Sequence, residues 1–481
     1  MSLIDSEQTL LTGAHDSQLY GSVATRSGHV HISAKEELGV VSRSLAPLVV
    51  TFFLQYLLSV VSIYATGRLG PRELAAASLA VCSFNITGLS VYQGMATCLD
   101  SFCSQAYGAG RPTMVGVYFQ RCSLMMMALT VFPLCPLWWF SGLLLKLMVP
   151  DAELAMMSQQ YLRTMILGAP ALLLFETGKR FLQAQHIFQA GTYVLGVAVP
   201  LNFVLNWLLV WHPTYGVGFV GAPLATALSY WATCLLLLLY VLFVDGKKCW
   251  GGLDWARARS NWLQMLALAL PGVVMVEAEY LAFEVMTILA ASFGTLALAA
   301  QSIASNVGSL LFQLPFAVSV AVSTRVGHFV GKRKVPEARL VTRVAMVLGV
   351  AISVVNFAWI LALRNALVAV FTEDADVLRL GADVLVLVAV NQLADGINVM
   401  QAGVLRGQGR QRIGSNVNVV SYYAVALPLA YVLAFRMGHG LMGLWAGLVV
   451  GVAALAAAES ACVWASNWPR ILADSEGRHD A

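Results

Sequence analysis

The chain has little charge. Asp, Glu, Lys and Arg together form 11% of its 481 residues, whereas apolar residues form 59% and the mean hydropathy is +0.74. This composition excludes an ordinary soluble domain. The formal net charge is +4, and the basic residues are spread over many short connections without forming a patch. We therefore expect no nucleic-acid partner.

Motifs for catalysis and for cofactor or metal binding are also missing. The chain has no GxxxxGK[ST] phosphate loop, no HExxH zinc motif and no CxxC pair among its eight cysteines. We predict that it is not an enzyme and binds no cofactor or metal. A membrane enzyme with a buried histidine is the competing class, but the histidines of the apolar region lie at predicted helix ends or in loops: His186, His212, His328 and His439.

The apolar residues are gathered into about twelve long stretches. A bilayer core requires roughly 20 apolar residues per helix, and it offers the backbone no hydrogen-bond partner. We therefore predict an all-α membrane protein with twelve transmembrane helices that has the lipid bilayer as its surroundings. The predicted spans are residues 44–67, 74–104, 118–142, 157–182, 190–211, 219–244, 262–291, 296–324, 338–363, 377–404, 413–436 and 441–466.

The segments outside these spans predict the topology. Residues 1–43 and 468–481 are polar tails, and an even number of spans places both on one side. Connections on that side carry most of the Lys and Arg, so we predict that both tails are cytoplasmic. The first tail is expected to be disordered, or to form a short amphipathic helix at residues 32–41. A plasma-membrane or vacuolar location is compatible with this topology.

An internal repeat divides the membrane region. The segment LGPRELAAASLA, which starts at Leu69, returns as FGTLALAAQSIA, which starts at Phe293. Two further echoes have nearly the same offset: GAGRP from Gly108 with FVGKR from Phe329, and LQAQ from Leu182 with LRGQ from Leu405. We predict an N-lobe at 44–244 and a C-lobe at 262–467, joined by a cytoplasmic linker at 245–261. Six spans each make the repeats parallel, hence related by a pseudo-twofold axis along the membrane normal, around a central cavity.

The motifs LGPRELAAASLA, SQAYGAGRPTMVG, PFAVSVAVSTRVGHFVG and LRGQGRQ resemble the multidrug and toxic compound extrusion family, in its eukaryotic-type branch. The resemblance covers nearly the whole membrane region. It implies two six-helix lobes in a V around a central cavity. It also implies export of organic cations or other xenobiotics by alternating access, in exchange for protons or, in some members, sodium.

Three carboxylates lie within one apolar span: Glu277, Glu279 and Glu284. At about 100° per residue, Glu277 and Glu284 lie within about 20° of one helix face, and Glu279 lies about 140° from Glu284. Acids in hydrocarbon are costly unless they are used or neutralised. A cluster of this kind can hold a proton and release it when a cation enters. Neutralisation by structural hydrogen bonds is the alternative, and it is strongest for Glu277.

The resemblance implies which of these acids act. It places Glu279 and Glu284 at the acidic positions of the family's helix 7, and Asp395 at that of helix 10. Asp395 is also unusual by itself, because it lies in the middle of a span without a basic residue within one helical turn. Where relatives often have an acid in helix 8, this chain has Asn306. We predict that Glu279, Glu284 and Asp395 bind the coupling ion and the substrate.

Other polar residues within the spans have less certain roles. Additional cavity residues are expected among Glu277, Asn306, Tyr280, Gln55, Asn85 and Asn398. Asp100 is expected to pair with Arg111 or Arg121, and Glu176 with Lys179 or Arg180, at the cytoplasmic ends of their helices.

These features together predict a monomeric, proton-coupled antiporter for a small organic cation or an amphipathic substrate. A sodium-coupled exporter is one alternative. A flippase for lipid-linked substrates with the same two-lobed architecture is another. Basic residues lining the cavity would favour the flippase, because an anionic headgroup requires cations. The intramembrane charges identified here are acids.

Overall fold

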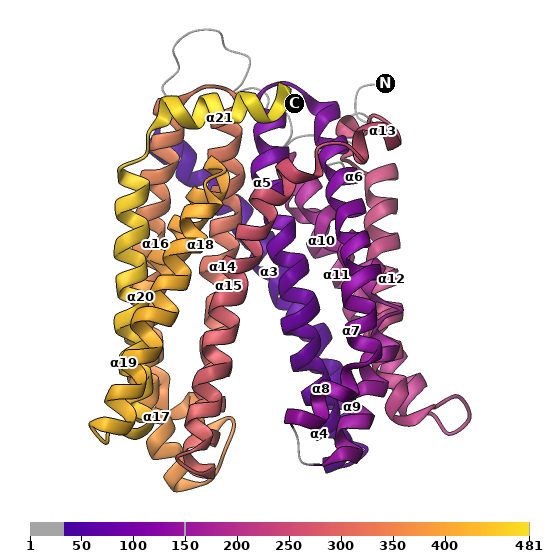
Figure 1. Ribbon diagram of the computed structural model, residues 1–481, viewed down its shortest axis with the longest axis vertical. Helices are drawn as coiled ribbons and strands as arrows, with labels where there is room; N and C mark the ends of the chain where they lie inside the picture. The colour runs from indigo at the N-terminus through magenta and orange to yellow at the C-terminus, as the bar shows by residue number, and fades with distance from the viewer. Residues whose placement is uncertain (1–32, 149–150, 481) are drawn as a thin grey trace, which may run out of the picture.

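The computed structural model describes residues 33–148 and 151–480, and all regular structure in these residues is helical. The helices form two bundles that stand side by side (Figure 1). The first bundle contains α3 (Ala34–Gly67), α4 (Pro71–Phe84), η1 (Asn85–Leu89), α5 (Ser90–Gly108), α6 (Pro112–Leu129), η2 (Thr130–Leu134), α7 (Cys135–Trp139), α8 (Ser141–Met148), α9 (Ala152–Met165), α10 (Ala169–Ala184), α11 (Gln189–Asn206), η3 (Trp207–Trp211), η4 (Gly218–Val220) and α12 (Gly221–Phe243).

The connection between the bundles contains η5 (Lys247–Cys249) and α13 (Trp255–Ala258). The second bundle contains α14 (Trp262–Ala291), α15 (Thr295–Gly331), α16 (Val335–Ala369), α17 (Ala375–Gln408), α18 (Gln411–Val419), η6 (Val420–Ala426), α19 (Leu427–Tyr431), η7 (Val432–Arg436) and α20 (Gly440–Trp464), and it is followed by α21 (Trp468–Asp480). Each bundle has its own apolar core, and a third cluster packs α3 against α15, α16 and α17.

Eleven helices in the described residues are long and apolar enough to span a bilayer. The remaining predicted span, 157–182, is divided into α9 and α10 by a turn at residues 166–168. Pro170 has no N–H, so the carbonyl oxygen of Ile166 accepts a hydrogen bond from the N–H of Ala169 instead (3.3 Å). The turn is thus hydrogen-bonded, which agrees with one interrupted crossing.

The first helix begins earlier than the sequence predicted. Ser33 caps α3 in a capping box with Glu36, and Glu37 is buried in an ion pair with Arg325 of α15 (Oε2–Nη2 2.6 Å). The prediction of a disordered tail is therefore wrong for residues 34–43. They are helical, but as part of the first span and not as a separate amphipathic helix. The rest of the predicted tail, residues 1–32, lies outside the described residues.

The start of α3 and the whole of α21 lie at one end of the molecule, which we call the terminal end (Figure 1). The predicted C-terminal tail is the helix α21, which lies across both bundles. Ser475 Oγ donates to Gln105 Oε1 of the first bundle (2.9 Å), and Glu476 pairs with Arg333 of the second (2.5 Å). The two bundles meet at the terminal end, and their ribbons diverge toward the opposite end.

Glycines allow this close contact between the bundles. A Cβ on Gly108 would lie 2.1 Å from the carbonyl oxygen of His328, and a Cβ on Gly331 would lie 2.0 Å from that of Gln105. These positions are equivalent in the two repeats, since both pairs are 223 residues apart (105 and 328, 108 and 331). Such a reciprocal contact is what a twofold axis between the repeats produces.

Candidate functional site

The buried acids of the first bundle are paired with cations. Asp100 on α5 accepts two hydrogen bonds from Arg180 Nη1 on α10, at 2.7 and 2.8 Å. Arg406 of α17 approaches the same carboxylate (Nε–Oδ2 3.5 Å). The predicted pairing of Asp100 with Arg111 or Arg121 is wrong, because α10 packs against α5, whereas Arg121 donates to the backbone of Arg257 (3.2 Å).

Glu176 on α10 pairs with Lys179, as predicted (Oε1–Nζ 2.9 Å). Gln55 of α3 completes this group, because its Nε2 donates to Glu176 Oε1 (2.6 Å) and its Oε1 accepts from Lys179 Nζ (2.8 Å). The nitrogen and the oxygen of the Gln55 amide group thus each form a hydrogen bond inside the first bundle. Gln55 therefore serves as a bridge in this triad in the observed conformation.

The three carboxylates of α14 point in two directions, as the helical geometry predicted. Ser90 Oγ donates to Glu277 Oε1, and Cys82 Sγ donates to Glu284 Oε1 (3.2 Å). Both donors belong to the first bundle, so Glu277 and Glu284 face across the gap between the bundles. Both carboxylates are only partly buried.

Glu279 lies on another side of α14 and is half-buried, as Glu277 and Glu284 are. It interacts electrostatically with Asp395 of α17, with Glu459 of α20 and with Tyr422 of η6. Asp395 is 5% exposed and Glu459 is fully buried. Within the described residues, none of the three carboxylates forms an ion pair with Lys or Arg. They form an acidic cluster, defined by Glu279, Asp395 and Glu459, that three helices of one bundle build.

Our sequence analysis missed Glu459. The signal was present, because Glu459 is a single acid in an otherwise apolar span, the feature that identified Asp395. Its Oε1 accepts a hydrogen bond from Asn418 Nδ2 (3.1 Å), whereas its Oε2 is buried and has no hydrogen-bond partner among the described residues.

The remaining predicted cavity residues are dispersed. Asn398 is buried one turn after Asp395 on α17. Asn306 is exposed, and its Nδ2 donates to Ser302 O of its own helix (2.8 Å). Tyr280 is 44% exposed, although it lies close enough to Glu279 to interact with it. Asn85 is half-buried at the start of the π-helical turn η1.

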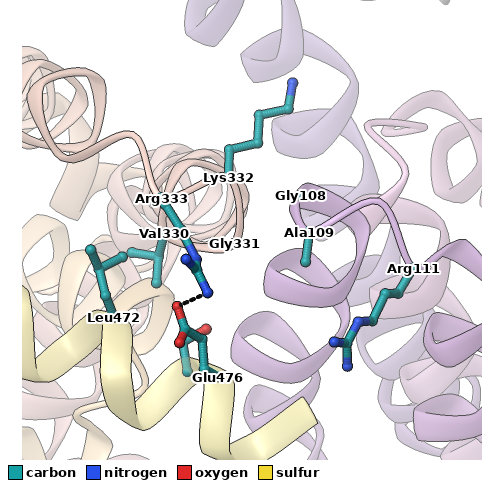
Figure 2. Close-up of a pocket in the computed structure, with 10 residues that line it drawn as sticks. Gly108, Ala109, Arg111, Val330, Gly331, Lys332, Arg333, Leu472 and Glu476 are labelled. Carbon is teal, nitrogen blue, oxygen red and sulfur yellow. Dashed lines mark ion pairs between the residues drawn. The ribbon is translucent and has the colours of Figure 1, made fainter. Parts of the chain in front are cut away.

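A cavity of about 410 Å³ lies at the terminal end, between the α5–α6 connection, the α15–α16 connection and α21 (Figure 2). Its lining includes Arg111, Lys332 and Arg333, and the guanidinium group of Arg333 points toward Glu476. None of the acids of the cluster lines this cavity. It therefore belongs to the contact between the bundles and not to the acidic cluster.

Next to this contact, the rings of His186 and His328 lie edge to face with centroids 4.9 Å apart, and Tyr107 packs against both. His186 lies in the α10–α11 turn of the first bundle, and His328 lies on α15 of the second. Burial, followed by the nearby charges of Arg325 and Lys332, lowers the pKa of His186 to about 3. A neutral His186 is therefore part of the closed terminal end.

The fold and the unpaired carboxylates are those of a polytopic membrane transporter built from two related bundles. Comparison with known families gives the assignment: the MatE family profile matches residues 47–208 and again 271–432. The two matches are offset by 224 residues, which is the offset of the repeat. The chain belongs to the MatE family, the multidrug and toxic compound extrusion transporters, as its motifs predicted.

Individual relatives agree with this assignment. The chain is 32% identical over 448 residues to human multidrug and toxin extrusion protein 1 (92% of this chain, 77% of that protein) and 33% identical over 420 residues to protein DETOXIFICATION 16 of Arabidopsis thaliana (87% and 86%). It is 39% identical over 448 residues to an uncharacterized transporter of Saccharomyces cerevisiae, covering 93% of this chain but only 64% of the length of that relative. The crystal structure of the eukaryotic MATE transporter AtDTX14 superposes with a TM-score of 0.85 at 27% identity (92% of this chain, 98% of that one).

Proposed function

We propose that the chain is a secondary active transporter that exports organic cations or other xenobiotics by alternating access, in exchange for protons. The observation that supports this proposal is the electrostatic interaction of the half-buried Glu279 with the buried Asp395, neither of which forms an ion pair with Lys or Arg among the described residues. Two carboxylates close together in a low-dielectric interior cannot both be charged without a large electrostatic cost. Binding of a proton or of a cationic cargo relieves this cost, so the pair is suited to hold either one.

Direct competition then couples the two movements. When a proton occupies Glu279 or Asp395, the attraction for an organic cation is lost, and when the cation binds, the proton is released. Each bundle contains one copy of the repeat, so rocking of one bundle against the other would expose the site to the two sides of the membrane in turn. Glu284, at the gap between the bundles, would contact the cargo on its way to Glu279.

One observation favours sodium as an alternative coupling ion. Asn391 and Asn398 lie on α17 within one helical turn of Asp395, and the Oδ1 atom of each is buried without a hydrogen-bond partner among the described residues. Together with the Asp395 carboxylate, these oxygens are of the type that binds a hard cation. The flippase alternative requires cations that can bind an anionic headgroup, whereas Lys179, Arg180 and Arg325 are engaged by carboxylates.

The proposal extends to topology. We propose that the protein acts as a monomer and has no catalytic activity. We also propose that it lies in the plasma or vacuolar membrane and that its terminal end faces the cytoplasm. The distribution of Lys and Arg supports this orientation.

The deciding experiment is reconstitution of the full chain in proteoliposomes, with fluorescence of the organic cation ethidium as the readout. Proton coupling predicts that an imposed pH gradient drives ethidium movement and that a sodium gradient without a pH gradient does not. The opposite result would assign the coupling to sodium. Ethidium movement that ignores both gradients would refute secondary active transport.

A further inference from the structure

Glu459 is a buried carboxylate that the proposed exchange at Glu279 and Asp395 does not use. It lies on α20 and is 0% exposed. Asn418 donates to its Oε1, while its Oε2 faces no hydrogen-bond donor among residues 33–148 and 151–480. A carboxylate in an apolar bundle with one oxygen unsatisfied is costly when charged. A proton on Oε2 would remove that cost.

The groups that face Glu459 come from several helices. Asn418 of α18 donates a hydrogen bond to it, and Glu279 of α14, Arg406 of α17 and Tyr422 of η6 interact with it electrostatically. Arg410 is engaged further along α20 by the carbonyl oxygen of Cys462 (3.2 Å). Arg406 is thus the cation that interacts with Glu459.

Arg406 also belongs to the contact between the bundles. Its Nε lies 3.5 Å from Asp100 Oδ2 of the first bundle, and its backbone oxygen accepts a hydrogen bond from Ser101 Oγ (2.5 Å). Asp100 is already held by Arg180 through two shorter hydrogen bonds. Arg406 can therefore move away from Asp100 without leaving a buried charge unpaired, which distinguishes it from Arg180.

We propose that Glu459 is a third proton-binding carboxylate of the second bundle, and that it competes with Asp100 for Arg406. With a proton on Oε2, Glu459 is neutral and no longer attracts Arg406. Arg406 then interacts with Asp100 across the gap between the bundles. When that proton is released, the charged Glu459 draws Arg406 into the second bundle and weakens the contact at the terminal end. The occupancy of the acidic cluster thus controls whether the terminal end can open. This inference rests on the proposed proton coupling, since Glu459 interacts with Glu279.

Two substitutions separate the two partners of Arg406. Glu459→Gln retains the size of the side chain and a partner for Asn418 but can bear no charge, so the terminal end should stay closed at every pH. Arg406→Met removes the shared cation while Asp100 keeps Arg180, so the contact should be weakened at every pH. Glu459→Asp should restore the pH dependence with a shifted midpoint, and Glu337→Gln, an acid of α16 paired with Lys334 (3.6 Å), serves as the control.

The readout is hydrogen–deuterium exchange of the full chain in lipid nanodiscs across a pH series. Protection of peptides from α5 and the end of α17 is measured relative to peptides from α12 in the same sample, which corrects for the intrinsic pH dependence of exchange. Wild type and Glu337→Gln should lose relative protection as the pH rises, Glu459→Gln should remain protected, and Arg406→Met should show low protection that does not change with pH. Ethidium exchange by Glu459→Gln should be slow at every pH, because the terminal end of this variant stays closed.

Wild-type pH dependence in Glu459→Gln would overturn the inference, as would wild-type protection in Arg406→Met. If Glu459→Gln does not fold, Glu459→Asp and Arg406→Met decide. The proposed function fails in a different way. If the proposed function fails, ethidium movement in the wild type does not respond to a pH gradient. If only this inference fails, the wild type still couples ethidium movement to the pH gradient, and the Glu459 and Arg406 variants behave like the wild type.

Discussion

The two bundles arise from one repeat, yet they treat buried charge differently. In the first bundle, Asp100 and Glu176 are each bonded to a cation, at 2.7 and 2.9 Å. In the second bundle, none of the acidic cluster residues Glu279, Asp395 and Glu459 forms an ion pair with Lys or Arg among the described residues. A paired acid contributes to a fixed structure, whereas an unpaired one remains available to a mobile cation.

The repeat shows that the cations of the first bundle have no equivalent in the second. When the echo at Leu182 and Leu405 is aligned, Lys179 and Arg180 of the first bundle correspond to Ala402 and Gly403 of the second. A Cβ on Gly403 would lie 2.6 Å from the carbonyl oxygen of Ser319, so this position has no room for a side chain. The second bundle has small residues where the first has its cations.

The largest effect is expected from breaking a pair in the first bundle. Arg180→Met leaves the buried Asp100 with only the more distant Arg406, and loss of one partner of a buried pair costs about 3–5 kcal/mol of unfolding free energy. The unfolding temperature in detergent should fall strongly. Arg72→Met, which breaks an exposed pair with Glu153 (2.8 Å), is the control and should change it little. Equal effects of the two variants would show that burial does not distinguish these pairs.

Neutralising the acidic cluster should remove transport and leave stability nearly unchanged. Glu279→Gln and Asp395→Asn each remove a charge that attracts the cation, and a loss of roughly 2.7 kcal/mol lowers affinity about a hundredfold. Ethidium affinity and ethidium-driven proton movement in proteoliposomes measure the effect, with the exposed Glu153→Gln as control. Normal coupling in both variants would show that the acidic cluster is not the coupling site. Glu284 or a polar group of the first bundle would then be the candidate.

The contact between the bundles should respond to acid. His186 has a pKa of about 3 when folded and about 6.5 when unfolded. Because the unfolded chain binds the proton more readily, His186 lowers stability as the pH falls from about 6.5 toward 3, by up to about 1.4 kcal/mol per pH unit. His186→Asn tolerates the left-handed backbone there (φ 65°) and should flatten the fall of unfolding temperature between pH 7 and 5. An unchanged slope would contradict the assignment.

Features that depend only on position along a single helix could be predicted from the sequence. The spans, the repeat and the opposite directions of Glu279 and Glu284 on α14 all follow from hydrophobic length and helical periodicity. The sequence did not predict what depends on neighbours in space. Asp100 pairs with Arg180, which is 80 residues away, and not with the nearer Arg111 or Arg121. Likewise the polar α21 has no apolar signal, and it is fixed by contacts with both bundles.

The smallest effect sharpens the comparison at α21, which contacts the first bundle through a buried hydrogen bond and the second through an exposed ion pair beside the buried Trp468 and Ile471. Arg333 and Glu476 are 68% and 45% exposed, so Glu476→Gln should cost less than about 1 kcal/mol, and high salt should remove most of that. Ser475 is 3% exposed, and Ser475→Ala leaves the buried Gln105 Oε1 without its donor, at a cost of about 1–3 kcal/mol that does not depend on salt. Unfolding temperatures at low and high salt test both. A salt-sensitive Ser475→Ala effect, or a larger loss in Glu476→Gln than in Ser475→Ala, would mean that α21 is held mainly from the second bundle.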